Sequence, residues 1–178
     1  MSESVPALEI RRAAVSATAV DDALRLINLD LLEHGASSKT LGEWLWSSHW
    51  FPHLNWRDEI VGLAQSLPSE WTTGQICDPQ ILLQFPHTGP KPDITFHVDR
   101  EPDWADGRRY LRIVGIPLGR WSRSNGGLLV EQEDRVTPVE LDSGDAVMMA
   151  PQLRHSGGLN MSGAIRYGVY LRWLAEGD

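Results

Sequence analysis

The second half of the chain contains a succession of short apolar runs, and this pattern limits the possible folds more than any other feature. From residue 76 onward the runs are ICDPQILLQF, ITFHVD, YLRIVGIPL, GGLLVEQ, VTPVEL, DAVMMA and RYGVYLRWL. Clusters of Gly, Pro, Asn and Asp separate them, as in HTGPKPD, SNGG and DSGD. Many short strands punctuated by turns are typical of a β-sandwich or barrel. The pattern predicts a β core over about residues 76–175.

The residues before this core have a helical character. In the segment 19–34, the apolar residues Leu24, Ile27, Leu31 and Leu32 follow helical spacing, and we predict a helix there. Two more helices are expected over 39–49 and 56–67, split at Pro52, and a first strand within 7–15. Helices followed by strands indicate an α+β, mainly β fold. We therefore predict one domain over residues 1–178, with a helical part at about 16–70 packed on the β core.

The composition excludes several classes of partner. The net charge of the 178-residue chain is −8, which does not favour binding to nucleic acid. No apolar run approaches the ~20 residues that a membrane helix needs. The N-terminus lacks the features of a signal peptide, and the single cysteine, Cys77, allows no intrachain disulfide. We expect a cytoplasmic protein that binds a small molecule, and neither nucleic acid nor a membrane; the oligomeric state stays open.

Two polar residues in ITFHVD raise the possibility of a metal site. His97 and Asp99 are two residues apart, so in a strand their side chains share a face. His155, which follows the apolar run DAVMMA, is the candidate third ligand. Two histidines and one carboxylate suit Fe(II) oxygen chemistry, with zinc as the main chemical alternative. The structural alternative is a simple His–Asp hydrogen bond at a strand end.

A 2-oxo-acid cosubstrate would also need a buried cation for its distal carboxylate, and arginine suits this role. Arg166 lies eleven residues after His155, at the start of the last apolar run. Arg172 lies six residues further on, so both side chains would share a face of a strand. We favour Arg166 because it is nearer to the candidate ligand. The alternative is a surface arginine paired with one of the many acidic residues.

Three segments together resemble a known family. They are LLQFPHTGPKPDITFHVD, NGGLLV and LDSGDAVMMAPQLRHSGGLNMSGAIR, and the last contains an H…N…S…R series formed by His155, Asn160, Ser162 and Arg166. In this order they resemble the Fe(II)/2-oxoglutarate-dependent dioxygenases, and among these the phytanoyl-CoA dioxygenase-like branch. The resemblance covers about residues 80–174. The chain is shorter than is common in that family, which leaves little room for lids around the site.

The resemblance implies a double-stranded β-helix (jelly-roll) with iron in its open mouth. It implies His97, Asp99 and His155 as the Fe(II) ligands, Arg166 as the anchor of 2-oxoglutarate, and Gln84 as a residue facing this cosubstrate. The implied reaction consumes O2 and 2-oxoglutarate and releases succinate and CO2. Halogenating relatives replace the carboxylate with a small residue, so Asp99 favours hydroxylation.

The substrate is the least constrained part of the hypothesis. An amino acid or a biosynthetic intermediate would suit the acidic, compact chain. Candidate substrate contacts are Trp104, Arg112 and Trp121, from the segments that would surround the mouth. Two alternative functions remain: a cupin-type metalloenzyme that does not use 2-oxoglutarate, and a non-catalytic jelly-roll protein that binds a ligand.

Overall fold

The structure is a computed structural model that describes residues 7–34, 48–50, 53–87, 94–99 and 110–174. The elements are β1 (Leu8–Arg11), α1 (Ala17–His34), β2 (Ser48–Trp50), α2 (Asp58–Val61), β3 (Gln75–Ile76), β4 (Gln80–Gln84), β5 (Tyr110–Pro117), β6 (Leu128–Gln132), β7 (Arg135–Val139), β8 (Ala146–Met149), β9 (Arg154–Gly157) and β10 (Arg166–Leu174). Two 3-10 turns, Gly62–Ser66 and Ser69–Trp71, follow α2. Helices thus precede most of the strands, as the sequence predicts.

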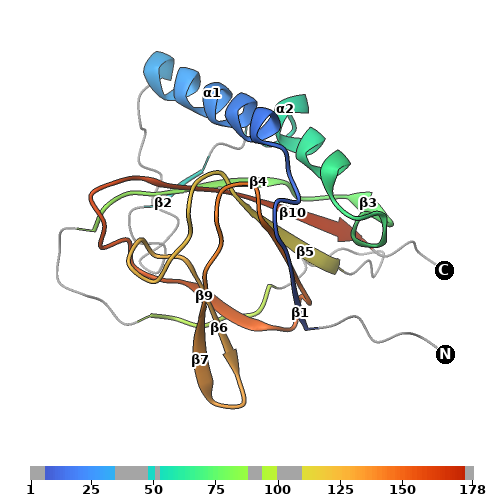
Figure 1. The fold of residues 1–178 in the computed structure, drawn as a ribbon, viewed down its shortest axis with the longest axis vertical. Coiled ribbons are helices and arrows are strands. Elements are labelled where there is room, and N and C mark those ends of the chain that lie inside the picture. Colours follow the sequence, from blue (N-terminus) through green and yellow to red (C-terminus); the bar gives the residue numbers. More distant parts are fainter. Residues whose placement is uncertain (1–6, 35–47, 51–52, 88–93, 100–109, 175–178) are drawn as a thin grey trace.

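The strands form two antiparallel sheets. The larger one has the order β1-β8-β5-β10-β4-β2, with β3 also paired to β10, and the smaller one has the order β7-β6-β9. In Figure 1 the helices lie over one side of the larger sheet, while β6, β7 and β9 lie on its other side. This mainly β arrangement confirms the predicted class and is consistent with a jelly-roll core. The double-stranded β-helix itself stays a prediction.

Two apolar clusters fill the space on either side of the larger sheet. Val169, Leu171 and Trp173 of β10 belong to the cluster that also contains Val20 and Ile27 of α1. The alternate residues of β10 point the other way, because successive side chains of a strand face opposite sides of its sheet. That second face packs on a smaller cluster with residues of β6, and it carries the polar side chains discussed below.

Helix α1 begins two residues earlier than the predicted segment, where the hydroxyl of Ser16 accepts a hydrogen bond from the Ala19 N–H at 3.2 Å. Ile27 is fully buried, and Leu24 and Leu31 pack against the same core. Leu32 is 84% exposed, although it follows the same helical spacing in the sequence. Leu31 and Leu32 are adjacent on a helix and point about 100° apart, so only one of them meets the sheet.

Three other local predictions differ from the structure. The helix expected over 56–67 is a single α-helical turn that continues as a 3-10 turn. Of the helix expected over 39–49, residues 39–47 lie outside the described part, and Ser48 and His49 belong to β2. The segment 94–99 makes an isolated bridge at His97 in place of a full strand. The short strand β9 was not predicted, because RHSG carries no apolar alternation.

The Gly-Asp turn before β8 is fixed by a buried carboxylate. Asp145 accepts hydrogen bonds from the N–H groups of Ala13 and Asp142, both at 2.9 Å, and pairs with the Arg12 guanidinium at 2.5 Å. Burial alone would raise the pKa of Asp145, but the two N–H groups and Arg12 outweigh this effect and lower it. The ionised carboxylate therefore ties the N-terminal segment to the β core.

Within the described ranges, no helix has the length and apolar character needed to cross a bilayer.

Candidate metal centre and buried arginine

The two candidate histidine ligands lie directly opposite each other. The His97 N–H donates to the His155 carbonyl at 2.9 Å, and the His155 N–H donates back to the His97 carbonyl at 2.8 Å. This reciprocal bridge places the segment 94–99 beside β9 of the smaller sheet. Opposite residues of an antiparallel pair carry their side chains on the same face. The two imidazole centroids are accordingly 4.6 Å apart.

Asp99 completes the cluster. Its Oδ1 lies 3.6 Å from Nε2 of His97 and 3.6 Å from Nε2 of His155. The three donor atoms that these residues offer all lie within 4.8 Å of one another. The side chains of Asp99 and His155 are 12% and 8% exposed, and that of His97 is 36% exposed. Two imidazole nitrogens and one carboxylate oxygen are ligand types that suit Fe(II) or zinc.

The protonation of His155 suits a metal ligand. Its Nδ1 lies 2.9 Å from the Leu153 carbonyl oxygen, which can only accept a hydrogen bond. Nδ1 therefore carries the proton, and the lone pair of Nε2 is directed at the cluster. Burial lowers the pKa of His155, and the nearby His97 and Arg172 act in the same direction, while Asp99 and the Leu153 carbonyl oppose them. The ring is thus neutral at neutral pH, as metal binding requires.

Asp99 is ionised despite its burial. Burial alone would raise the pKa of Asp99, but its interactions with His97, with the Arg172 guanidinium and with His155 lower it well below its usual range. Arg172 contributes through Nε and Nη2, which donate to Oδ2 of Asp99 at 3.1 and 2.9 Å. The site therefore holds a fixed negative charge on which a cation can bind.

Arg166 is a buried cation of a different kind. It is 4% exposed, and its Nε and Nη1 have no hydrogen-bond partner in the described structure. Its guanidinium lies over the Trp121 ring, 5.3 Å from the centroid. Burial lowers the pKa of Arg166, and only Tyr170 opposes this effect. A guanidinium with two unpaired N–H-bearing nitrogens and no carboxylate among the described residues is suited to receive an anion.

The indole of Trp121 forms one wall beside Arg166. Trp121 is fully buried, and its Nε1–H donates to the Tyr167 carbonyl at 2.9 Å. Gly168 makes room for it, because a Cβ at this position would lie 2.4 Å from a ring carbon of Trp121. The stacked ring of Tyr170 lies 5.5 Å away between centroids. Trp121, expected as a substrate contact, is therefore buried against the Arg166 guanidinium.

Gln84 lies beside Arg166, as its partner in the β4–β10 register. It is buried, its amide donates to the Gly158 carbonyl at 2.7 Å, and its Oε1 has no hydrogen-bond partner in the described structure. Gly126 of the NG turn approaches closely with a φ of +76°, and a Cβ there would lie 2.4 Å from this Oε1. Only glycine suits both the conformation and the space at this position.

Asn160 fixes the loop between the last candidate ligand and Arg166. Its amide donates to the carbonyls of Gln84 and Ala164, both at 2.8 Å, and its Oδ1 accepts from the N–H and hydroxyl of Ser162 at 3.0 and 2.7 Å. All of its amide hydrogen-bonding capacity is used in the fully buried interior. The asparagine and serine of the H…N…S…R series therefore position the start of β10.

Arg172, the second arginine of β10, is paired with carboxylates, unlike Arg166. In addition to Asp99, its Nη1 reaches Asp78, at 3.4 Å from the main-chain oxygen and 3.5 Å from the carboxylate. Two carboxylates thus already surround this guanidinium. The two arginines lie on the same face of β10, as their spacing predicts, but only Arg166 offers unpaired donors for an added anion.

Arg112 lies away from this compartment. It shares a face of β5 with Val114 and Ile116, which pack on the helix side. Its guanidinium donates to the Glu70 carbonyl and, at 3.0 Å, to the Thr73 hydroxyl. The expectation that Arg112 faces inward toward a substrate was therefore wrong; it fastens the turn after α2. Trp104, the remaining candidate, lies outside the described residues.

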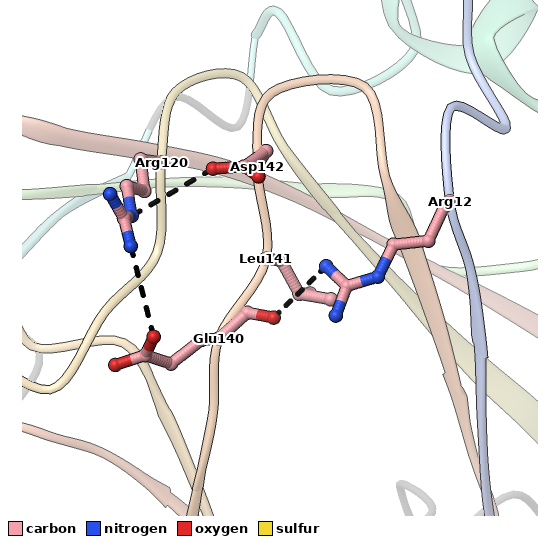
Figure 2. Close-up of a pocket in the computed structure, with 5 residues that line it drawn as sticks. All are labelled: Arg12, Arg120, Glu140, Leu141 and Asp142. Carbon is pink, nitrogen blue, oxygen red and sulfur yellow. Dashed lines mark hydrogen bonds and ion pairs between the residues drawn. The ribbon is translucent and has the colours of Figure 1, made fainter.

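A pocket of about 230 Å³ lies at a separate place, lined by Arg12, Arg120, Glu140, Leu141 and Asp142. Figure 2 shows both arginines turned toward acceptors of the same pocket. Arg120 pairs with Glu140 at 3.8 Å and with Asp142 at 3.7 Å, and Arg12 donates to the Glu140 carbonyl at 3.2 Å. Its charges are balanced internally, and none of the three candidate metal ligands lines it.

Two residues of the site were missed by the sequence analysis. Tyr170 lies between Arg166 and Arg172 on the same face of β10. It is an even number of residues from each of them, and this spacing could have identified it. Asp78 contacts Arg172 from the segment between β3 and β4. No local pattern indicates this contact, since the two residues are far apart in sequence.

Comparison with known proteins gives matches in structure only. No protein family model and no curated protein sequence matches the chain. Among solved structures, the chain is similar to the non-heme alpha ketoglutarate dependent carbocyclase SnoK from nogalamycin biosynthesis, with a TM-score of 0.67 and 16% identity over 94% of this chain and 79% of that one.

Two further solved structures cover most of both chains. HygX from Streptomyces hygroscopicus, solved with nickel, 2-oxoglutarate and hygromycin B bound, gives a TM-score of 0.65 and 12% identity over 94% of this chain and 82% of that one. A Pseudomonas putida prolyl-4-hydroxylase gives 0.62 and 15% over 96% and 94%. At these identities the similarity establishes a shared fold.

Proposed function

We propose that this protein is an Fe(II)- and 2-oxoglutarate-dependent oxygenase that acts on a small molecule, with residues 1–178 forming a single oxygenase domain. One observation carries the proposal: a cluster of two histidines and one carboxylate lies near a buried arginine whose Nε and Nη1 are unpaired and whose Nη2 lies 3.6 Å from the position of a Cβ on Gly157, two residues after His155. The first feature suits a divalent metal, and the second suits a carboxylate. Each would be costly to keep without its ligand.

In this proposal, His97, Asp99 and His155 hold Fe(II), and Arg166 binds the distal carboxylate of 2-oxoglutarate. Gln84 faces the cosubstrate with its unpaired Oε1. Fe(II), when bound with 2-oxoglutarate, supplies the activation of O2 that yields succinate, CO2 and an oxidised substrate. The choice of Arg166 over Arg172 rests on the partners of each guanidinium, because Arg172 is already paired with Asp99 and Asp78.

The chain's own residues contribute position and charge. The Leu153 carbonyl holds the proton of His155 on Nδ1 and keeps Nε2 free. Asp99 supplies the negative charge. Trp121 and Tyr170 exclude water from the Arg166 guanidinium, which strengthens its attraction for a carboxylate.

We propose hydroxylation as the outcome, since Asp99 retains the carboxylate that halogenating relatives lack. The substrate is proposed to be a small molecule, because structural neighbours include HygX, which was solved with hygromycin B, and the epimerase SnoN, which was solved with nogalamycin RO. The phytanoyl-CoA dioxygenase-like branch stays a prediction, since no family model matches.

A cupin-type metalloenzyme that needs no 2-oxoglutarate is the second candidate, and a non-catalytic ligand-binding protein is the third. The unpaired Arg166 argues against the second, because that chemistry does not explain a buried cation beside the metal cluster. The buried and ionised Asp99 argues against the third, since a purely structural triad does not need a carboxylate oxygen directed at two imidazoles.

The proposal is tested by following succinate production with Fe(II), 2-oxoglutarate, O2 and ascorbate across a panel of small molecules. Turnover should depend on 2-oxoglutarate and be abolished in His97→Ala and Asp99→Ala. The matched control is His34→Ala, which removes a histidine exposed at the end of α1 and should keep wild-type turnover. Wild-type turnover in either triad variant would refute the assignment.

A further inference from the structure

Arg172 binds only one of the two carboxylate oxygens of Asp99, so the two oxygens have different surroundings. Its Nε and Nη2 both donate to Oδ2, at 3.1 and 2.9 Å. The other oxygen, Oδ1, faces the Nε2 atoms of His97 and His155. One oxygen is therefore occupied by a cation of the chain, and the other is directed at the remaining donors of the candidate metal site.

Arg172 is itself fixed from its far side. Its Nη1 lies 3.4 Å from the Asp78 main-chain oxygen and 3.5 Å from the Asp78 carboxylate. That carboxylate also accepts hydrogen bonds from the Gln80 amide at 2.9 Å and the Tyr110 hydroxyl at 3.4 Å. The Arg172 side chain is 10% exposed. A guanidinium that is held by Asp78 on one side can fix the orientation of Asp99 on the other, because the guanidinium itself has little freedom to move.

Arg172, Asp78 and Asp99 together carry a net negative charge, which can attract a metal ion. A cation close to a metal site would repel the metal if it were unbalanced. Arg172 is flanked by two carboxylates, so Asp78 offsets its charge and Asp99 retains its own. The contact between Arg172 and Asp99 can therefore orient the ligand without cancelling its attraction for a divalent ion.

We propose that Arg172 is a positioning residue that restricts Asp99 to binding the metal through Oδ1 alone; this rests on the proposed function. Carboxylates bind metals through one oxygen or through both. Binding through both would require Oδ2 to leave two charge-assisted hydrogen bonds, which are among the stronger interactions in proteins. Single-oxygen binding leaves a coordination position for the cosubstrate or O2 that a second carboxylate oxygen would fill.

The test compares Arg172→Gln and Arg172→Lys with the control Arg112→Gln in Co²⁺ titrations of the metal-free protein. Calorimetry measures the affinity, and the visible absorption of bound Co²⁺ reports the coordination number. Arg112 is a matched control because it is also a buried arginine, on the strand next to β10, and does not contact the triad.

We expect Arg172→Gln to bind Co²⁺ about 10- to 100-fold more weakly, as for other partners of metal ligands, with a changed absorption intensity. Arg172→Lys should recover part of the affinity, because an ammonium can donate to Oδ2, and Arg112→Gln should match the wild type in both measurements. Wild-type affinity and absorption in Arg172→Gln would overturn the proposal.

If Arg172→Gln does not fold, Arg172→Lys carries the test alone: an affinity below that of the wild type supports the proposal, and unchanged affinity and absorption overturn it. Failure of the wild-type protein to bind Co²⁺ would instead contradict the proposed function.

Discussion

Replacing Arg166 with methionine should make the ligand-free protein more stable while removing its affinity for 2-oxoglutarate. The guanidinium is 4% exposed and has two nitrogens without partners in the described structure. A buried ion that lacks a counter-ion costs several kcal/mol. Methionine is similar in length, is uncharged, and can pack its sulfur on the Trp121 ring.

The magnitude follows from the contacts that would be lost. The cation–π contact with Trp121 contributes up to about 2 kcal/mol. This contact offsets part of the cost of the buried ion, and the methionine adds about 1 kcal/mol through its sulfur contact. We therefore expect a net stabilisation of about 1–3 kcal/mol. For a chain of 178 residues this corresponds to a rise in Tm of about 2–12 °C.

Thermal unfolding measured with and without 2-oxoglutarate checks both parts of this prediction. In the metal-loaded wild type, 2-oxoglutarate at about 100 times its Kd should add about 2.7 kcal/mol of stability, and in Arg166→Met it should add none. Arg112→Met is the control with the opposite sign, because Arg112 donates to Glu70 and Thr73 and its loss should lower Tm. A decrease in Tm for Arg166→Met as large as that for Arg112→Met would show instead that the buried Arg166 guanidinium stabilises the ligand-free protein.

Three further predictions concern the parts that support the site. Asn160→Ala removes two 2.8 Å hydrogen bonds to main-chain carbonyls and should lower the free energy of unfolding in denaturant by about 2–4 kcal/mol; a loss below about 1 kcal/mol contradicts this. Gly168→Ala should displace Trp121, cost about 1–3 kcal/mol and weaken 2-oxoglutarate binding in calorimetry, and an unchanged Kd would be evidence against it. The pKa of Asp145 is lowered by folding, so its stabilisation is present above about pH 3.9 and is lost as the pH falls through the folded value. The Tm values of wild type and Asp145→Asn should therefore converge as the pH decreases from about 5 to 2, and a constant difference would contradict this prediction.

The alternation of apolar residues predicted most of the strands, because the period of two is a local property of a strand that packs on one face. The same parity predicted that Arg166 and Arg172 share a face of β10. It could not predict their different partners, because Asp78 and Asp99 reach Arg172 from distant parts of the chain. The relation between His97 and His155 is of this kind too, since β9 has no local strand pattern and forms by pairing with β6.

The position of Arg112 on β5 could not be predicted from the alternation of its strand. The sequence indicates which residues of β5 share a face, but not which face meets the helices. Burial of an arginine on the apolar helix side is tolerated because the Glu70 carbonyl and the Thr73 hydroxyl accept its hydrogen bonds. These acceptors belong to a turn whose position relative to β5 depends on the packing of the whole chain.

The central claim is that the His97–Asp99–His155 cluster binds Fe(II) and that Arg166 binds 2-oxoglutarate beside it. Anaerobic calorimetric titrations of Fe(II), followed by 2-oxoglutarate, test this claim most directly. We predict that one Fe(II) binds to the wild type and to Arg166→Met but not to Asp99→Ala, and that 2-oxoglutarate then binds only to the iron-loaded wild type. Binding of 2-oxoglutarate to Arg166→Met with wild-type affinity, or of Fe(II) to Asp99→Ala with wild-type affinity, would contradict it.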